Sequence, residues 1–350
     1  MKTSIIKFSD KDMCKNKENL KKITRTFKEG GLVVFPTETV YGLGANGFDK
    51  EAVKKIYKAK GRPTDNPSIL HIAKISQLNE LVKDVPKIAK KCIKNFWPGP
   101  LTIIFKKSDL VPLEVTGGLD TVAIRMPSNK IAAQILRDVN LPIAAPSANI
   151  SGRPSPTKAS HVIEDLMGKV DIIVDGGQSL VGIESTVLDV TTDPPMILRP
   201  GKITLEDLQK IDKSIGIDNT TIDAIDKSIP KSPGQKYKHY APRGQATCFV
   251  GDLNNVVNEI NKRIEKANGK VAVLATSQTI NKYVGADLLL NLGDRNNLEE
   301  VANSLFDHLR KCDEEKVDII FAEGFELRGM GLSIMNRLLK ACAGKVVIGL

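Results

Sequence analysis

Short apolar runs alternate with stretches of helical period over residues 1–210, and this alternation constrains the fold more than any other feature. The runs that resemble strands lie at 32–35, 69–72, 101–105, 121–126, 142–145, 171–174, 185–190 and 196–198. Apolar residues recur at helical spacing within 51–61, 75–85, 87–96, 129–139 and 160–168. Such a pattern is typical of a sheet whose faces are covered by helices. We therefore predict a mixed α/β domain.

A length of 350 residues favours two domains. Residues 204–211 form a capped helical segment that closes the first domain, so we place that domain at 1–210. Residues 211–245 lack periodicity and are rich in Asp, Lys, Ser and Pro, which indicates an interdomain linker. In 246–350, apolar runs again alternate with helical stretches. This pattern predicts a smaller, Rossmann-like parallel α/β domain, although no G-x-G-x-x-G follows its first strand.

The formal net charge of +10 indicates an anionic partner, either nucleic acid or a small phosphorylated molecule, unless the lysines only form solvated helix faces. No apolar run is long enough for a membrane span, and the N-terminus lacks the pattern of a secretion signal. The cysteines are single and form no C-x-x-C, which argues against a zinc ribbon or a redox pair. We therefore expect a cytoplasmic protein.

The sequence contains no P-loop, H-E-x-x-H, G-x-S-x-G or kinase motif. Instead, polar segments follow apolar strands. In "FPTETVYGLGAN", Thr37 and Thr39 place two hydroxyl groups beside an expected glycine-containing turn, either as ligands or as ordinary loop residues. In "KAKGRPTDNPSILHI", Lys60 and Arg62 end a helix, where they could hold a polyanion or only complement the helix dipole.

Three later segments repeat this arrangement. Arg125 lies in an apolar strand and needs an anionic partner, either a ligand or a structural carboxylate. "AAPSANISGRPSPT" leaves a buried strand through small and hydroxyl residues, while Ser185 and Arg199 stand at strand ends. Because α/β sheets bind ligands at strand ends, these segments together predict a ligand site.

Seven motifs in order resemble those of the YrdC-like threonylcarbamoyl-AMP synthases. They are "FPTETVYGLGAN", "KAKGRPTDNPSILHI", "WPGPLTIIF", "GLDTVAIRMP", "PIAAPSANISGRPSPT", "GIESTVLD" and "ILRPG". The segment "SPGQKYKHYAP" followed by a second α/β domain is similar to the two-domain form of that family. The resemblance implies an open twisted sheet with a concave basic site. It also implies a nucleotidyltransferase that makes L-threonylcarbamoyl-AMP and pyrophosphate from L-threonine, bicarbonate and Mg²⁺-bound ATP, for modification of tRNA next to the anticodon.

The resemblance also implies the roles of individual residues. The threonine-binding set is Thr37, Thr39, His71, Arg125 and Ser185. The ATP-binding set is Lys60, Arg62, Asn66, Thr121, Ala145, Ser147, Asn149, Ser155, Arg199 and Tyr240, with Lys60 and Arg62 also catalytic. Mg²⁺ is expected on the nucleotide phosphates and not on protein ligands. The product is expected to pass to a tRNA threonylcarbamoyl-transferase complex.

Two further hypotheses come from the basic charge and from the linker. An RNA-binding factor is the alternative function, although 5% aromatic residues and the lack of an RNP-type strand weaken it. Weak RNA binding by the enzyme remains compatible with the charge. Residues 232–244 combine prolines, aromatic rings and cations, so we expect a strap over the site in which Tyr240 contacts the nucleotide and Lys236 and Lys238 lie near its phosphates. Packing of these rings against the second domain is the alternative.

Overall fold

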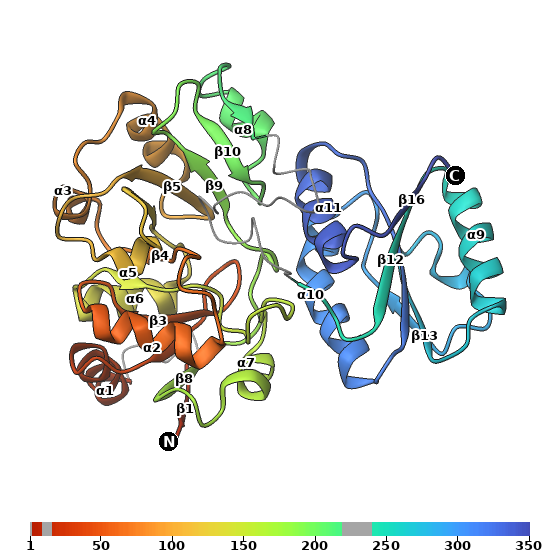
Figure 1. Ribbon diagram of the computed structural model, residues 1–350, viewed down its shortest axis with the longest axis horizontal. Helices are drawn as coiled ribbons and strands as arrows, with labels where there is room; N and C mark the ends of the chain where they lie inside the picture. The colour runs from red at the N-terminus through yellow and green to blue at the C-terminus, as the bar shows by residue number, and fades with distance from the viewer. Residues whose placement is uncertain (1, 9–15, 219–239) are drawn as a thin grey trace.

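The computed structural model describes residues 2–8, 16–218 and 240–350, which form two α/β domains (Figure 1). The first sheet has the strand order β1-β8-β2-β3-β7-β4-β6-β5-β9-β10-β11. Its strands are β1 (Ser4–Lys7), β2 (Val33–Phe35), β3 (Gly42–Asn46), β4 (Ile69–His71), β5 (Leu101–Lys106), β6 (Thr121–Arg125), β7 (Ile143–Ala144), β8 (Ile172–Asp175), β9 (Thr186–Asp189), β10 (Met196–Arg199) and β11 (Gly216–Ile217). Parallel pairs such as β4–β6 alternate with antiparallel pairs such as β5–β6, which confirms the predicted mixed sheet.

The helices of this domain are α1 (Lys17–Lys28), α2 (Lys50–Lys60), α3 (Leu78–Leu81), α4 (Lys87–Phe96), α5 (Leu113–Thr116), α6 (Lys130–Val139), α7 (Ala159–Leu166) and α8 (Leu205–Gln209). Helix α2 shows how the sequence produces them. The Asp49 carboxylate accepts hydrogen bonds from two backbone N–H groups of the first turn, and Gly61 ends the helix in the left-handed conformation. The face that carries Val53 and Ile56 is buried, so α2 delivers Lys60 and Arg62 to the sheet edge.

The prediction of a glycine-containing turn after Thr39 is wrong. Gly42 and Gly44 lie inside β3, which pairs antiparallel with β2. A Cβ atom on Gly44 would come within 2.8 Å of both Ile143 and Phe35, so the neighbouring side chains leave room only for glycine. Strand propensity gives no signal for such a segment, because its glycines are selected by close packing.

The elements that were not predicted are β1, α1, α5, β11 and, in the second domain, α9 (Leu253–Glu265). Strand β11 pairs with β10 and thus extends the first sheet to Ile217, while the second domain's first strand begins at Gln245. The proposed boundaries at 210 and 245 therefore fall close to these two strands, and most of the intervening linker lies outside the described residues.

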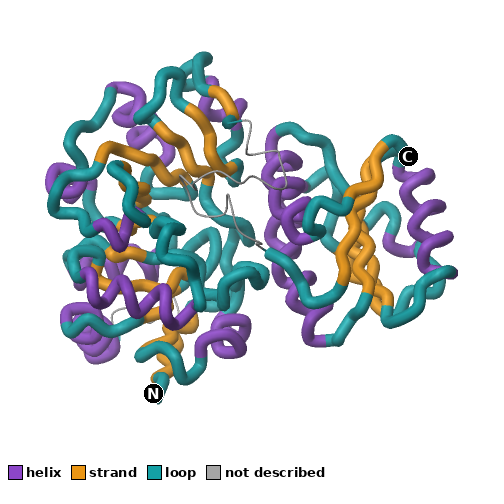
Figure 2. The backbone as a smooth tube through the Cα atoms, viewed as in Figure 1, coloured by secondary structure: helices purple, strands orange, loops and turns teal. Residues whose placement is uncertain are grey.

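The C-terminal domain contains β12 (Gln245–Val250), α9 (Leu253–Glu265), β13 (Val271–Ala275), β14 (Leu288–Asn291), α10 (Leu298–Glu314), β15 (Ile319–Glu323), α11 (Gly329–Ala341) and β16 (Val346–Ile348). All pairs in its sheet, ordered β14-β13-β15-β12-β16, are parallel, which confirms the Rossmann-like prediction. Helix α9 covers one face, and α10 and α11 cover the face toward the first domain (Figures 1 and 2).

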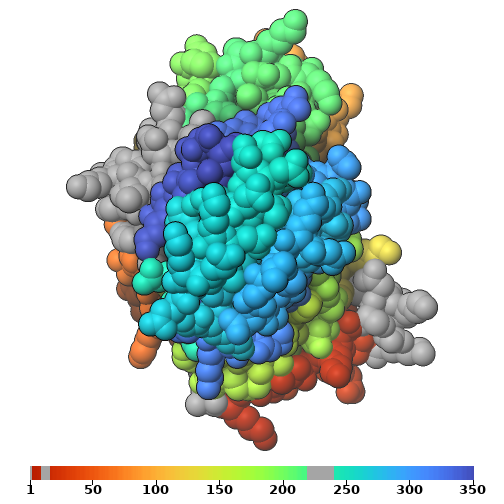
Figure 3. All heavy atoms as spheres, turned by 90° about the vertical axis from the view of Figure 1, so that its right-hand side faces the viewer, coloured from red at the N-terminus to blue at the C-terminus, as the bar shows by residue number. Residues whose placement is uncertain are grey.

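The two domains share an apolar cluster. Val40, Val181 and Ile183 of the first domain pack with C-terminal residues such as Phe306 and Leu309 on α10. Figure 3 shows the C-terminal domain covering the middle of the first domain. The two domains therefore meet in a packed interface, which places α10 and α11 next to the loops of the first sheet.

In the described parts of the chain, no helix combines the length and apolar character that a membrane crossing requires. Four cysteines are free and buried, namely Cys92, Cys248, Cys312 and Cys342. Cys14 lies outside the described residues.

Candidate active site

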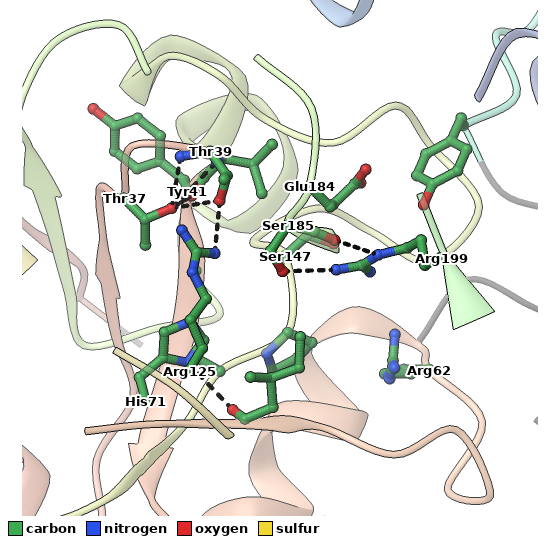
Figure 4. A pocket seen from close by; sticks show the side chains of 16 residues that line it. Thr37, Thr39, Tyr41, Arg62, His71, Arg125, Ser147, Glu184, Ser185 and Arg199 are labelled. Carbon is green, nitrogen blue, oxygen red and sulfur yellow. Dashed lines mark hydrogen bonds between the residues drawn. The ribbon is translucent and has the colours of Figure 1, made fainter. Parts of the chain in front are cut away.

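A cavity lies where the polar segments following several strands of the first sheet meet (Figure 4). Its lining residues are Thr37, Thr39, Val40, Tyr41, Gly42, Arg62, Ile69, His71, Arg125, Ala145, Pro146, Ser147, Glu184, Ser185, Arg199 and Tyr240. The tertiary structure thus brings together ten of the residues proposed from sequence, which come from segments up to two hundred residues apart. Its free volume is about 50 Å³.

One side of the cavity is built around Arg125, whose guanidinium points toward Thr39 (Figure 4). Arg125 Nη1 donates to the Thr39 hydroxyl at 2.8 Å, and its Nη2 lies 2.7 Å from Glu38 Oε1. Burial raises the pKa of the Glu38 carboxyl, but the charge of Arg125 and its hydrogen bond outweigh burial, so the pKa is lowered overall. The structural carboxylate that was one of the two expected partners of Arg125 is therefore Glu38. Arg125 also lines the cavity.

The Thr37 hydroxyl organises the loop on the same side. It lies 2.9 Å from the Thr39 hydroxyl, donates to the Val40 carbonyl at 2.6 Å and accepts from the Val40 backbone N–H. His71 lies nearby, edge-on to Phe35. Burial, reinforced by the charge of Arg125, lowers the pKa of His71 to about 3, so the imidazole is neutral at physiological pH.

This shift has a consequence for stability. The pKa of His71 falls from 6.5 in the unfolded chain to about 3 in the folded chain, so the unfolded state binds the extra proton in that window. The free energy of unfolding should therefore fall by about 1.4 kcal/mol per pH unit as pH drops below 6.5, from this residue alone. Chemical denaturation of wild type and His71→Gln between pH 4 and 8 should show a shallower dependence in the variant. Parallel curves would contradict the shift.

The opposite side of the cavity holds Arg199 and Arg62 (Figure 4). Arg199 donates to the Ser185 carbonyl at 3.0 Å and to the Ser185 hydroxyl at 3.1 Å. Arg62 Nη2 donates to the Asn66 side-chain oxygen at 2.6 Å and to the Pro67 carbonyl at 2.8 Å. Burial lowers the pKa of Arg62 to about 10, which still leaves it charged at neutral pH. Asn66 thus supports Arg62 and is absent from the lining.

Lys60 also lies behind the cavity wall. Its buried Nζ donates to the carbonyl of Ser147 and, at 2.5 Å, to the carbonyl of Asn149. The Lys60 carbonyl in turn accepts from the Ser151 N–H, so the end of α2 and the loop after β7 are tied together. Burial lowers the pKa of Lys60 well below its usual range. Lys60 is therefore placed to support the loop after β7.

The remaining sequence-proposed residues occupy different places. The Asn149 side-chain oxygen accepts from the Ser147 hydroxyl at 2.6 Å, and the Ser155 hydroxyl donates to Glu184 at 2.5 Å. Both therefore contact residues that line the cavity. Thr121 begins β6, at the other end of the strand from Arg125, and is absent from the lining.

Tyr240 contacts both domains. It lines the cavity, and its ring packs against that of Phe306 with centroids 5.1 Å apart. Burial raises the pKa of its hydroxyl to about 12, so it remains protonated. The two readings of this tyrosine, a site residue and a ring packed on the second domain, are therefore compatible. Residues 232–239 of the proposed strap, including Lys236 and Lys238, lie outside the described residues.

Sequence reasoning missed Glu38, Glu184 and Tyr41. Each glutamate stands among hydroxyl residues inside an apolar segment, "PTETV" and "GIESTV", which is a signal for a buried acid that needs a cationic partner. The Tyr41 hydroxyl donates to the Gly177 carbonyl at 2.6 Å and closes the cavity wall. Among the described residues, no group of three or more His, Cys, Asp or Glu is arranged to hold a metal ion.

Three guanidinium groups, several hydroxyls and one neutral imidazole around a small cavity suit carboxylate and phosphate ligands. The fold and this cavity define a two-domain α/β protein whose first domain has a cavity lined by three arginines. A family described as telomere recombination matches residues 25–201, and one described as threonylcarbamoyl-AMP synthase, C-terminal domain, matches residues 203–343.

Relatives agree with these matches over nearly the full length. The chain is 48% identical to the threonylcarbamoyl-AMP synthase of Bacillus subtilis, covering 96% of each chain. It is 47% identical to that of Pyrococcus abyssi, covering 91% of this chain and 93% of the relative. A crystal structure of the Pyrococcus abyssi Sua5 protein complexed with L-threonine superposes with a TM-score of 0.91 at 44% identity, covering 99% of each chain. The chain belongs to the threonylcarbamoyl-AMP synthase family and is an enzyme of the nucleotidyltransferase type that makes threonylcarbamoyl-AMP.

Proposed function

We propose that the cavity joins L-threonine, bicarbonate and ATP, with Arg125 on the threonine side and Arg62 and Arg199 on the nucleotide side. The observation that carries this proposal is the separation of three buried guanidinium groups onto two sides of one cavity. A carboxylate and a polyphosphate are the two anions that this reaction must hold apart and then bring together.

On the threonine side, the guanidinium of Arg125 has five N–H donors, and among the described residues its Nε, Nη1 and Nη2 contact Gly99, Thr39 and Glu38 with one donor each. Two donors therefore remain for a carboxylate. Thr37, Thr39, His71 and Ser185 surround the same space. The neutral imidazole of His71 can accept or donate a hydrogen bond without adding charge.

On the nucleotide side, Arg62, Arg199, Ser147, Ala145 and Tyr240 line the cavity and would contact ATP. Behind them, the supporting residues are Lys60, Asn66, Asn149 and Ser155. ATP would enter as its Mg²⁺ complex, with the cation held on the phosphates, since the lining carboxylate Glu184 is already paired with Arg337. Lys60 acts through the loop that it holds.

The reaction takes its nucleophile from the substrate. The threonine amine and bicarbonate give a carbamate and water. A carbamate oxygen then attacks the α-phosphorus of ATP while the bond to the β-phosphate oxygen breaks, giving threonylcarbamoyl-AMP and pyrophosphate. The protein has to orient the reactants and balance phosphate charge, which arginines and hydroxyls can do.

The free volume of about 50 Å³ is far below the roughly 300–1,000 Å³ of typical ligand pockets. We infer that the cavity widens when ATP binds, and closure afterwards would exclude water from a hydrolysable product. We place the enzyme in the cytoplasm, where its product passes to a complex that modifies tRNA next to the anticodon. Weak RNA binding by the basic surface remains a prediction.

Pyrophosphate release tests this proposal. It should require threonine, bicarbonate, Mg²⁺ and ATP together, and serine should react less well. A pocket fitted to the threonine methyl gains about 1–3 kcal/mol from it, or roughly 10- to 200-fold in kcat/KM. A coupled pyrophosphate assay with each component omitted in turn measures this requirement. Equal turnover of serine and threonine, or release of orthophosphate, would rule the proposal out.

A further inference from the structure

One buried arginine of the C-terminal domain reaches the wall of the active-site cavity. Arg337 lies on α11, which stands between the C-terminal sheet and the first domain (Figure 1). Its Nε is 3.1 Å from Glu184 Oε2, and the exposed fractions of the two side chains are 0% and 7%. The same guanidinium donates to the Glu184 carbonyl at 3.3 Å and to the Pro200 carbonyl. Arg337 therefore holds both the side chain and the backbone at Glu184.

Glu184 connects this contact to the site. Its other carboxylate oxygen accepts from the Ser155 hydroxyl at 2.5 Å, and the next residue, Ser185, receives both hydrogen bonds from Arg199. Arg337 thus supports the Glu184 carboxylate at the cavity wall. Through Glu184 it also supports the Ser155 hydroxyl, which we propose lies near ATP, and Arg199, which we propose faces the ATP phosphates.

The backbone beside this contact is held in the same way. The Ser333 hydroxyl, one turn earlier on α11, donates to the Gly201 carbonyl at 2.8 Å. A Cβ atom on Gly201 would lie 2.4 Å from the Thr186 nitrogen and 2.8 Å from the Glu184 carbonyl oxygen. The backbone of residues 184–186 is therefore in direct contact with that of residues 199–201. Side chains of α11 donate hydrogen bonds to both segments.

We propose that Arg337 is a positioning residue for the reaction, through which the C-terminal domain keeps the Glu184 carboxylate ionised and oriented at the active site. A buried carboxylate without a cationic partner either takes up a proton or turns toward water. Either change would release the Ser155 hydroxyl and loosen the segment that carries Ser185. The inference rests on the proposed function, because it assigns to Arg337 the geometry of that same site.

Other interdomain ion pairs hold the domains together without ending on the cavity wall. Asp307 on α10 pairs with Lys158 at 2.8 Å and with His161 at 3.1 Å, and none of these residues lines the cavity. Asp307→Asn therefore serves as a matched control, because it weakens the interface while leaving Glu184 and its contacts in place.

The experiment compares wild type, Arg337→Met, Arg337→Lys and Asp307→Asn in the full-length chain, by pyrophosphate release and thermal unfolding. We expect kcat/KM for ATP to fall about 100-fold in Arg337→Met, as for other small misplacements of reacting groups. Arg337→Lys should lose less activity than Arg337→Met but remain below wild type, because one ammonium group cannot reproduce the planar set of guanidinium donors. Asp307→Asn should remain within a few-fold of wild type, even if its midpoint of unfolding falls as far as that of Arg337→Met.

A double-mutant cycle with Glu184→Gln separates positioning from general stability. Once Glu184 is replaced, adding Arg337→Met should lower kcat/KM by clearly less than it does in the wild-type chain, because the ion pair is already lost and only the contacts of Arg337 with the Glu184 and Pro200 carbonyls remain to be removed. Additive losses would overturn the proposal, as would wild-type turnover by a folded Arg337→Met or an equal loss in Asp307→Asn. If Arg337→Met fails to fold, Arg337→Lys and the cycle built on it decide the question. A wild-type chain without pyrophosphate release would instead contradict the proposed function.

Discussion

Arg125→Lys is expected to weaken threonine binding by about 10- to 100-fold, although the positive charge is kept. The Arg125 guanidinium contacts Glu38, Thr39 and the Gly99 carbonyl at once, and Arg125 also lines the cavity. A lysine ammonium has three donors and no planar fork, so it cannot serve Glu38 and grip a carboxylate in two places. Losing one charge-assisted hydrogen bond costs about 1.5–3 kcal/mol, which corresponds to this range of affinity.

Calorimetric titration with threonine measures the effect, and thermal unfolding checks that the variant is folded. Arg137→Lys is a matched control, because Arg137 lies on the exposed face of α6 and donates to Gln134 of the same helix. It should bind threonine like wild type. Unchanged affinity in Arg125→Lys would mean that Arg125 serves Glu38 and the loop only, and that the threonine carboxylate is held elsewhere.

The second large effect is expected from Lys60→Met. The substitution preserves the apolar stem but removes the donor to the carbonyl of the buried Asn149 and to that of the half-buried Ser147. An unsatisfied buried acceptor costs about 1–3 kcal/mol, so the free energy of unfolding should fall by at least this amount, with a smaller addition from the Ser147 carbonyl, which can turn to water. Activity should be largely lost even where the variant is folded, because the loop that carries Ser147 is released. Arg62→Met should weaken ATP binding and also lower stability, because Arg62 donates to Asn66 and to the Pro67 carbonyl.

Lys58→Met is the control for the charge at the helix end. Lys58 stands in the same last turn of α2 but is exposed, so it shares the dipole interaction and lacks the two carbonyl contacts. Its free energy of unfolding, measured by urea denaturation, and its rate of pyrophosphate release should both be close to those of the wild type. If Lys58→Met and Lys60→Met lose the same stability and activity, both lysines act only on the helix dipole.

The local pattern of the sequence was sufficient for those elements that have a clear apolar period. The runs at 101–105 and 121–126 became β5 and β6, and the helical stretch at 87–96 became α4 with the same bounds. Period and composition suffice here, because these segments bury a face that their own spacing defines. The gathering of polar residues around one cavity was also predictable in outline, since residues that follow strands meet at the sheet edge. The motif series then identified the family.

The tertiary structure decided which side chains face the cavity and which support it from behind. Lys60 and Arg62 are two positions apart, yet only Arg62 lines the cavity, because the loop after β7 folds over Lys60 from nearly ninety residues away. Glu184 receives its partner Arg337 from another domain, 153 residues further along the chain. Such pairs carry no local period, and each charge finds its partner only when packing brings distant segments into contact and burial removes water as the alternative. The sequence by itself therefore determined the periodic strands and helices and the chemistry available, while packing determined the glycine strand β3 and which charges meet.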